Sequence, residues 1–149
     1  MPHLVILYTA NLDQPAAQGG SDMKALCRKL AETMLAARDE QGKQVFPTGG
    51  TRVLAFPAAH YAVADDGSAG RAAGGDGDYA FVYLNLRMAR GRSAAVHEAV
   101  GKAVEATAKE HFARHLATRH IGITLQIDEG HEVFDAKNSS LHPLFQPKG

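Results

Sequence analysis

Two strand–helix–strand units follow one another along this chain, and that order limits its possible folds more than any other feature. The first unit contains an apolar, β-rich run at 3–8, an amphipathic helix from Ser21 or Asp22 to about Arg38, and a second apolar run at 52–56. Crossovers of this kind are right-handed and join parallel strands. The first unit therefore predicts two parallel strands with a helix packed on one face.

The second unit repeats this order after a stretch rich in glycine and alanine at 68–77, which its composition predicts to be a connecting loop. A strand with period-two alternation occupies 79–87, Ser93 can cap a long helix that reaches Leu116, and a fourth strand follows at 121–127. Together the units predict a two-layer α+β fold. Tandem β-α-β repeats would form a four-stranded mixed sheet with two helices on one face.

Placing both helices on one face leaves the other face of the predicted sheet uncovered. The alternation at 79–87 allows two registers, in which either Phe81 and Tyr83 or Val82 and Leu84 lie on that face. Both registers would expose large apolar side chains, and such surfaces mark association sites. A symmetric oligomer whose sheets face a common axis would cover them.

The composition is that of an ordinary globular chain, and we interpret residues 1–149 as one domain. Hydrophobic residues make up 45% and charged residues 21%, and the formal net charge is zero. A neutral chain is not built for nucleic-acid binding as its main function. Within the domain we expect pseudo-repeats at about 1–66 and 78–130, followed by a C-terminal tail at 131–149.

Cysteine usage and hydropathy favour a cytoplasmic protein. Cys27 is the single cysteine, so no internal disulfide can form, which suits a reducing compartment. It falls on the apolar stripe of the first predicted helix, which favours burial over nucleophilic chemistry. No basic leader precedes a long apolar core, and no run of about 18 apolar residues occurs, so we expect no membrane partner.

Pro2 directly follows the initiator Met1, and its chemistry depends on whether Met1 is kept. If Met1 is retained, Pro2 contributes a tertiary amide and a stiff start to an edge strand. If Met1 is removed, Pro2 carries a secondary amine that can act as a base. The sequence leaves both states open.

Two other patterns have simple explanations. His111 and His115 lie one helical turn apart, but no carboxylate or cysteine accompanies them at metal-ligand spacing. We interpret them as a solvated helix face and predict no metal site. The PTGGTR segment at 47–52 leads into a strand and lacks the Lys-Ser/Thr ending of a P-loop, which argues against a phosphate site.

Four segments carry a resemblance to a known family. They are the PH start before an apolar strand, FPTGGTR before the second strand, DYAFVYLNLRMARGRS leading into the second helix, and NSSLHPLF near the C-terminus. In this order and at these spacings the chain resembles, essentially from end to end, the 5-carboxymethyl-2-hydroxymuconate delta-isomerase family of the tautomerase superfamily. The resemblance implies a homotrimer with its active site at the subunit boundary. It also implies a cofactor-independent isomerase of aromatic catabolism, in the homoprotocatechuate pathway.

The resemblance implies roles for three residues by their positions. Pro2 matches the family's amino-terminal proline, which acts as the catalytic acid/base. Arg52 of GGTR and Arg92 of GRS match arginines that would bind substrate. The implied partner is a small carboxylate substrate, with no metal, cofactor or nucleic acid. We expect His142, in the matched tail, to be structural and to close a subunit contact.

The chemistry of these residue types fits the implied reaction. A dienol tautomerises when a group removes its hydroxyl proton and a proton returns to a distant carbon, which suits an amine with a pKa near the working pH. An ordinary terminal amine has a pKa of about 7.7–8.0. Proline is more basic, and an apolar pocket with nearby arginines would lower its pKa. Planar guanidinium groups also bind carboxylates bidentately.

Departures from the family pattern leave other functions open. Leu7 and Leu54 stand where relatives often carry an acidic residue and a second arginine. The alternative is a non-catalytic trimeric tautomerase-like scaffold that binds a small acid or a protein partner. A third possibility is another reaction of the superfamily, such as dehalogenation or hydration, performed by the same amine.

Overall fold

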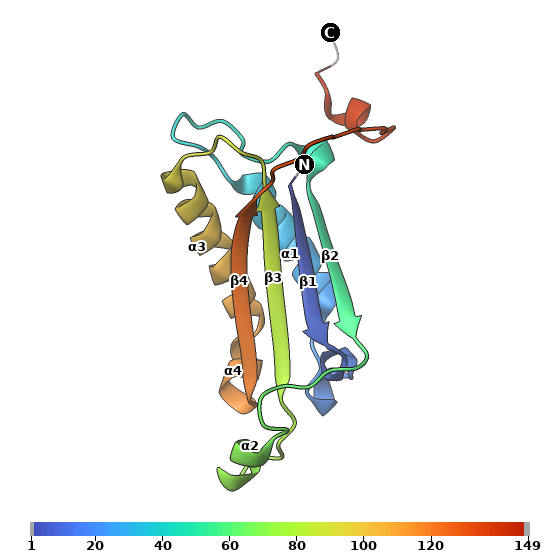
Figure 1. Cartoon of the computed structure of the whole chain (residues 1–149), viewed down its shortest axis with the longest axis vertical. Coiled ribbons are helices and arrows are strands. Elements are labelled where there is room, and N and C mark those ends of the chain that lie inside the picture. Colours follow the sequence, from blue (N-terminus) through green and yellow to red (C-terminus); the bar gives the residue numbers. More distant parts are fainter. Residues whose placement is uncertain (1, 148–149) are drawn as a thin grey trace.

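The computed structural model describes residues 2–147. Met1, whose removal would expose the Pro2 amine, lies outside the described residues, as do the last two residues of the predicted tail. Four strands form one sheet in the order β2-β1-β3-β4 (Figure 1). They are β1 (His3–Thr9), β2 (Arg52–Ala58), β3 (Ala80–Met88) and β4 (Ile121–Glu129). β1 and β2 are parallel, β3 and β4 are parallel, and β1 and β3 are antiparallel. The predicted mixed sheet is confirmed.

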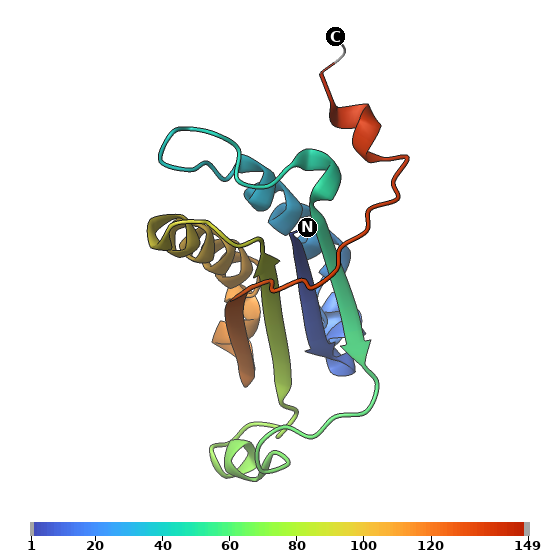
Figure 2. The ribbon, with the colours of Figure 1, turned by 45° about the horizontal axis from the view of Figure 1, so that its top comes forward.

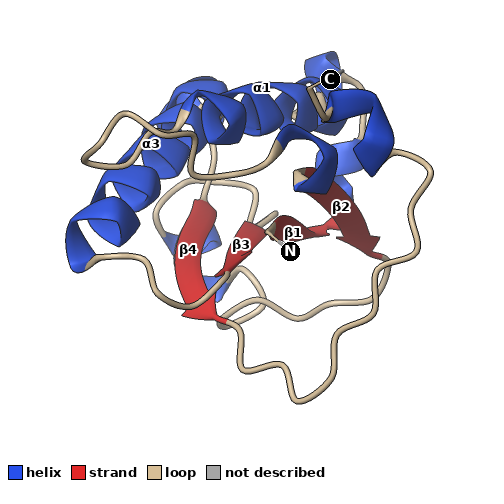
Figure 3. Cartoon of the chain, turned by 90° about the horizontal axis from the view of Figure 1, so that it is seen from above, coloured by secondary structure: helices blue, strands red, loops and turns tan. Residues whose placement is uncertain are grey.

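Helices cover one face of this sheet, as the view along the strands shows (Figure 3). The covering layer is formed by α1 (Met23–Ala36) and α3 (Ala94–His111). Two short helices, α2 (Ser68–Ala72) and α4 (Ala113–Thr118), complete the set. The Asp22 carboxylate caps α1 by accepting the Ala25 N–H at 2.9 Å. The predicted cap of α3 is also present, because the Ser93 hydroxyl accepts the Val96 N–H at 3.1 Å.

Alternation along the strands separates the core from the uncovered face. Val82 and Leu84 of β3 are fully buried against the helices, which decides the register that the sequence left open. Each such side chain stabilises the fold by about 1.5–3 kcal/mol. On the uncovered face, Leu7, Leu54 and Phe56 are 46–49% exposed. This apolar surface is the one for which the sequence predicts an oligomeric partner.

The stretch at 68–77 differs from the expected loop, because it begins with the short helix α2. Side chains just outside the stretch accept the N–H groups at the start of α2, which have no partner within the helix. The Asp65 carboxylate accepts the Ala69 N–H at 2.9 Å, and the Tyr79 hydroxyl accepts the Gly70 N–H at 2.7 Å. Composition alone could not reveal α2, since the groups that hold it lie outside the stretch.

The second long helix was also predicted incorrectly, because it does not continue to Leu116. It ends at His111, and α4 starts after Phe112, whose ring is fully buried and whose backbone leaves helical geometry. Leu116, in α4, is 44% exposed. Within residues 2–147, no helix combines the length and apolar character needed to cross a membrane.

The C-terminal arm, residues 131–147, leaves the end of β4 and runs across the end of the sheet toward β2 (Figure 2). Near its end, the 3-10 turn η4 (His142–Phe145) packs against the turn η3 (Thr48–Gly50) that precedes β2. The fit depends on Gly49, where an added Cβ would lie 3.1 Å from the Phe145 ring and 3.2 Å from the His142 Cα. The arm is therefore seated at the end of the sheet where β1 begins.

Candidate active site

A pocket of about 340 Å³ opens at this end of the sheet. Segments that are far apart in the sequence meet there: the start of β1, the loop before β2, the end of β3 with the turn into α3, and the C-terminal arm. The lining residues are Pro2, Val45, Phe46, Pro47, Met88, Ala89, Arg92, Lys137 and His142. A mostly apolar concave surface with a few polar groups is typical of a small-molecule site.

Pro2 reaches this pocket because it immediately precedes β1. Its missing N–H is tolerated at the first position of a strand. Residues alternate between the two faces of the sheet, so Pro2 lies on the same side as the buried Leu4 and is itself buried. The antiparallel pairing of His3 with Arg87 brings the end of β3, with Met88, beside Pro2.

Arg92 lies in the turn between β3 and α3. Gly91, in the left-handed conformation with φ of +87°, allows the chain to turn sharply just before it. The Arg92 guanidinium donates from Nη2 to the carbonyl oxygen of Val45, another lining residue, at 2.7 Å. On the other side, the Ser93 hydroxyl donates to the Glu40 carboxylate and lowers the pKa of that carboxyl. The start of α3 is therefore tied to the loop that precedes β2.

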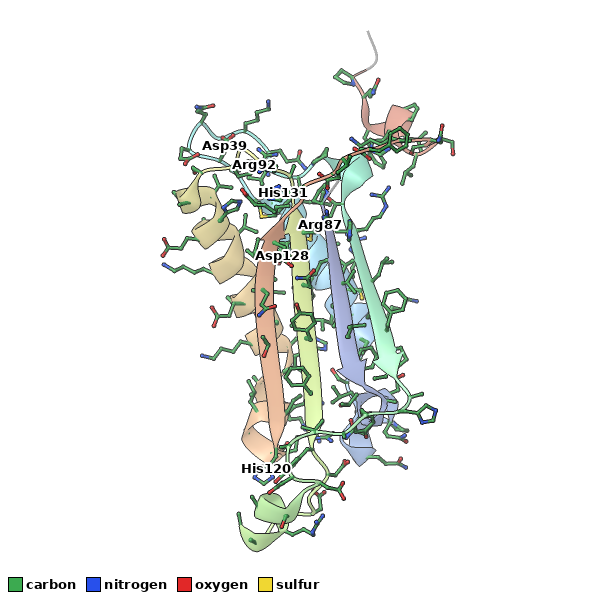
Figure 4. The ribbon with its side chains drawn as sticks, viewed as in Figure 1. Asp39, Arg87, Arg92, His120, Asp128 and His131 are labelled. Atoms are coloured by element: carbon green, nitrogen blue, oxygen red, sulfur yellow. The ribbon has the colours of Figure 1, made fainter. Side chains whose placement is uncertain are left out.

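That loop is ordered by its own hydrogen bonds. The Asp39 carboxylate accepts the N–H groups of Gln41 and Lys43 at 3.0 and 2.9 Å, and the Val45 N–H donates to the Ala37 carbonyl at 3.0 Å. Asp39 and Arg92 both lie at this end of the molecule (Figure 4). The Val45 carbonyl that orients Arg92 is thus held in place by the loop.

Arg52 does not line the pocket. It starts β2 opposite His3, on the uncovered face, and its Nη1 donates to the Gly50 carbonyl at 3.0 Å. Strand pairing places His3 opposite Arg87 and Arg87 opposite Asp128, so these residues form one row across the sheet with Arg52. Arg87 and Asp128 lie at the same end of the molecule as Arg92, far from His120 (Figure 4). The structure therefore brings Pro2 and Arg92 into one pocket and leaves Arg52 on the adjoining face.

Two lining residues were not predicted as part of a site. Lys137 carries no periodicity or motif that would connect it with Pro2, since 135 positions separate the two in the sequence. His142 falls in the NSSLHPLF segment, and its Nδ1 lies 2.8 Å from the Ser139 hydroxyl oxygen. Only the path of the arm brings these side chains to the pocket.

The interpretation of His111 and His115 as a solvated face is wrong. Both imidazoles are half-buried, and their Nε2 atoms lie 2.9 Å from the Ser21 hydroxyl and from the Gly20 carbonyl oxygen. They tie the helices to the loop before α1. In the part of the chain that the structure describes, no three His, Cys, Asp or Glu side chains gather as metal ligands would. Cys27 is half-buried, and burial raises the pKa of its thiol.

Comparison with known proteins identifies the family. The family profile of 5-carboxymethyl-2-hydroxymuconate isomerase matches residues 2–145, nearly the whole chain. The chain belongs to this family. A 5-carboxymethyl-2-hydroxymuconate Delta-isomerase from Escherichia coli is 26% identical over 146 residues, which cover 98% of this chain and 100% of the relative. A crystal structure of a 5-carboxymethyl-2-hydroxymuconate delta-isomerase is 57% identical, with a TM-score of 0.93 over 100% of this chain and 95% of that one.

Membership of the 5-carboxymethyl-2-hydroxymuconate isomerase family makes this protein an isomerase of the tautomerase type, with the fold of the tautomerase superfamily. The fold extends to distant proteins. A fused 4-OT described as an asymmetric trimer has a TM-score of 0.51 at 13% identity, covering 97% of this chain and 99% of that chain. At this distance the likeness shows the shared fold alone.

Basic side chains line the pocket at the Pro2 end. Of the described residues that line it, Arg92 and Lys137 are basic, and none is acidic. The side chains next to Pro2 are apolar, and Val45, Phe46 and Met88 are at most 2% exposed. Such a pocket favours an anionic ligand with an apolar body and disfavours a cationic amine.

Proposed function

We propose that this isomerase converts 5-carboxymethyl-2-hydroxymuconate, or a related 2-hydroxymuconate, to its 2-oxo-3-ene tautomer, with Pro2 as the acid/base. The observation that carries the proposal is that Pro2 and Arg92 line one pocket with otherwise mainly apolar walls. The names of the relatives support the substrate class. No cofactor is required for this reaction, because only protons and electron pairs move.

In the proposed reaction the Pro2 amine removes the proton of the 2-hydroxyl group. The O–H electron pair forms the C2=O bond, the C2=C3 pair shifts to C3–C4, and the C4=C5 pair takes a proton at C5. The prolinium delivers that proton and returns to the neutral amine, so the cycle balances. One group can serve both steps if its pKa lies near the working pH.

The surroundings of Pro2 support this use. Burial beside Phe46 and Met88 and the nearby Arg92 charge both disfavour the cationic amine, so they lower the pKa of a secondary amine toward neutrality. The proposal requires removal of Met1, because only then does Pro2 carry a basic nitrogen. With Met1 retained, the nitrogen is an amide.

The arginines would bind the substrate anion. Arg92 keeps guanidinium donors beyond the one that Val45 accepts, and such donors can hold a carboxylate and stabilise charge that builds on the 2-oxo oxygen. We propose a homotrimer in which the uncovered sheet face is buried. Arg52 lies on that face, so its carboxylate-binding role would be exercised at the subunit boundary.

The test joins a mass measurement with an assay. The intact mass of the purified protein is expected to be short by one methionine residue, and the protein is expected to convert 5-carboxymethyl-2-hydroxymuconate with proton exchange at C5. Processed protein that binds the diene acid without such exchange would contradict the proposal and favour a non-catalytic scaffold. A full-length mass in an active protein would rule out Pro2 as the base.

A further inference from the structure

The C-terminal arm brings a second basic side chain to the pocket. Arg92 enters from the turn before α3, whereas Lys137 enters from the arm, which crosses the end of the sheet beside the N-terminus (Figure 2). Both line the same space as Pro2. The two cations thus come from different segments of the chain.

The position of Lys137 is supported from the far end of the arm. His142 and Phe145 pack closely on Gly49, where an added Cβ would lie 3.1 Å from the Phe145 ring and 3.2 Å from the His142 Cα. The Ser139 hydroxyl accepts the N–H groups of Leu141 and His142 at 3.1 and 3.2 Å, which orders the turn that follows Lys137. The arm is therefore a seated part of the pocket wall.

The Lys137 ammonium is available to a ligand. It forms an ion pair with the Asp135 carboxylate, with Nζ 2.8 Å from Oδ2, and the two side chains are 50% and 46% exposed. Lys137 holds the pKa of the Asp135 carboxyl below its ordinary value. Exposed pairs of this kind are weak, so a carboxylate desolvated inside the pocket can compete with Asp135 for the ammonium. Arg92, in contrast, already donates one hydrogen bond to the pocket wall.

We infer that Lys137 is a second anion-binding group of the pocket and determines specificity for enol substrates that carry a second carboxylate. This inference rests on the proposed function for its substrate class. Two basic side chains from different segments suit a ligand with an acid group at each end of an apolar chain. A ligand with one carboxylate can be bound by Arg92 alone.

The test compares two six-carbon dienes that differ in charge. Calorimetric titration would measure the Kd of trans,trans-muconate, a dianion, and of sorbate, the monoanion with the same diene geometry. We expect the natural protein to bind muconate at least about tenfold more tightly. Lys137→Met should remove that preference by weakening muconate alone, and Lys137→Arg should restore most of it. Lys102→Met is the matched control, because Lys102 is also an exposed lysine in a local ion pair, with Glu98 on α3.

The outcomes separate this inference from the proposed function. A natural protein without preference, or a Lys137→Met variant that keeps the preference or loses affinity for both acids equally, overturns the role of Lys137. The titration measures binding without turnover. Failure of the enol assay would therefore overturn the isomerase proposal, whereas the muconate and sorbate affinities alone decide the role of Lys137. Loss of the preference in Lys102→Met would show a general charge effect and would also overturn the inference.

Discussion

The two ends of the sheet use their charged groups differently. At the end where α4 leads into β4, Arg119 is only 12% exposed and donates to the Gly19 carbonyl at 2.7 Å and to the Asp78 carboxylate at 3.0 Å. Asn11 donates to the same Asp78 at 2.9 Å. These groups bind one another and close the loops onto the helices.

At the Pro2 end, cations line a pocket instead. Arg92 makes one hydrogen bond to the wall, Lys137 makes one exposed ion pair, and no lining residue among those described is acidic. Groups that bind each other stabilise the fold, whereas donors directed into a cavity can bind an external anion. Substitutions at the two ends should therefore separate activity from stability.

The largest effect is expected for Pro2→Ala. The primary amine of alanine is more flexible than the proline ring and differs in basicity, so kcat should fall by about 100-fold or more, the range typical of a lost general acid–base group. The thermal midpoint should change little, because the strand β1 is kept. Pro15→Ala, at the opposite end, is the control and should keep full activity. Equal kcat values in both variants would refute the assignment of Pro2.

A smaller effect is expected for Arg92→Met. A hydrogen bond to a charged group contributes about 1.5–3 kcal/mol, so kcat/KM should fall by about 10- to 100-fold, mainly through KM. Arg92→Lys should recover only part of this, because a lysine cannot form the bidentate contact. Steady-state kinetics of the Arg92 variants would measure this loss, with Arg90→Met, at an exposed arginine two positions earlier, as the control. If the two variants lost activity alike, the effect would be general electrostatics.

How far the sequence predicts this end of the molecule depends on the range of the interactions. The positions of β1 and α1 follow from local periodicity and caps, which the sequence contains. Lys137 and His142 reach Pro2 only through the path of the arm, and no local pattern records that path. The short helix α2 and the break between α3 and α4 were missed for the same reason, since side chains outside α2 and the burial of Phe112 decide their structure. Which face of β3 is buried depends on the packing of the helices, which cover Val82 and leave Phe81 exposed.

At the other end, Arg119→Met should reduce stability and leave activity unchanged. Removing this largely buried guanidinium removes its hydrogen bonds to the Gly19 carbonyl and to Asp78, which keeps the bond from Asn11, so the free energy of unfolding should fall by about 2 kcal/mol. Urea denaturation would measure this, with exposed Arg114→Met as the control. The kcat/KM of the folded variant should stay within about twofold. A loss of activity without a loss of stability would contradict the contrast between the two ends.

The smallest effect concerns the pH dependence of stability at the same end. Burial, followed by the charges of Lys29 and His115, lowers the pKa of His111, while Asp22 opposes the shift. The folded state therefore prefers the neutral imidazole, which lies 2.9 Å from the Ser21 hydroxyl.

In the unfolded chain His111 regains its ordinary pKa of 6.5. As the pH falls below that value, the unfolded chain binds a proton that the folded chain resists, so the free energy of unfolding decreases. Urea midpoints at pH 7.5 and 5.5 should show a smaller decrease for His111→Gln, which can still hydrogen-bond Ser21, than for the natural protein. His60→Gln, at an exposed position, should retain the full decrease. An identical decrease in all three proteins would mean that other groups govern the acid sensitivity, and the His111 contact would then contribute through packing alone.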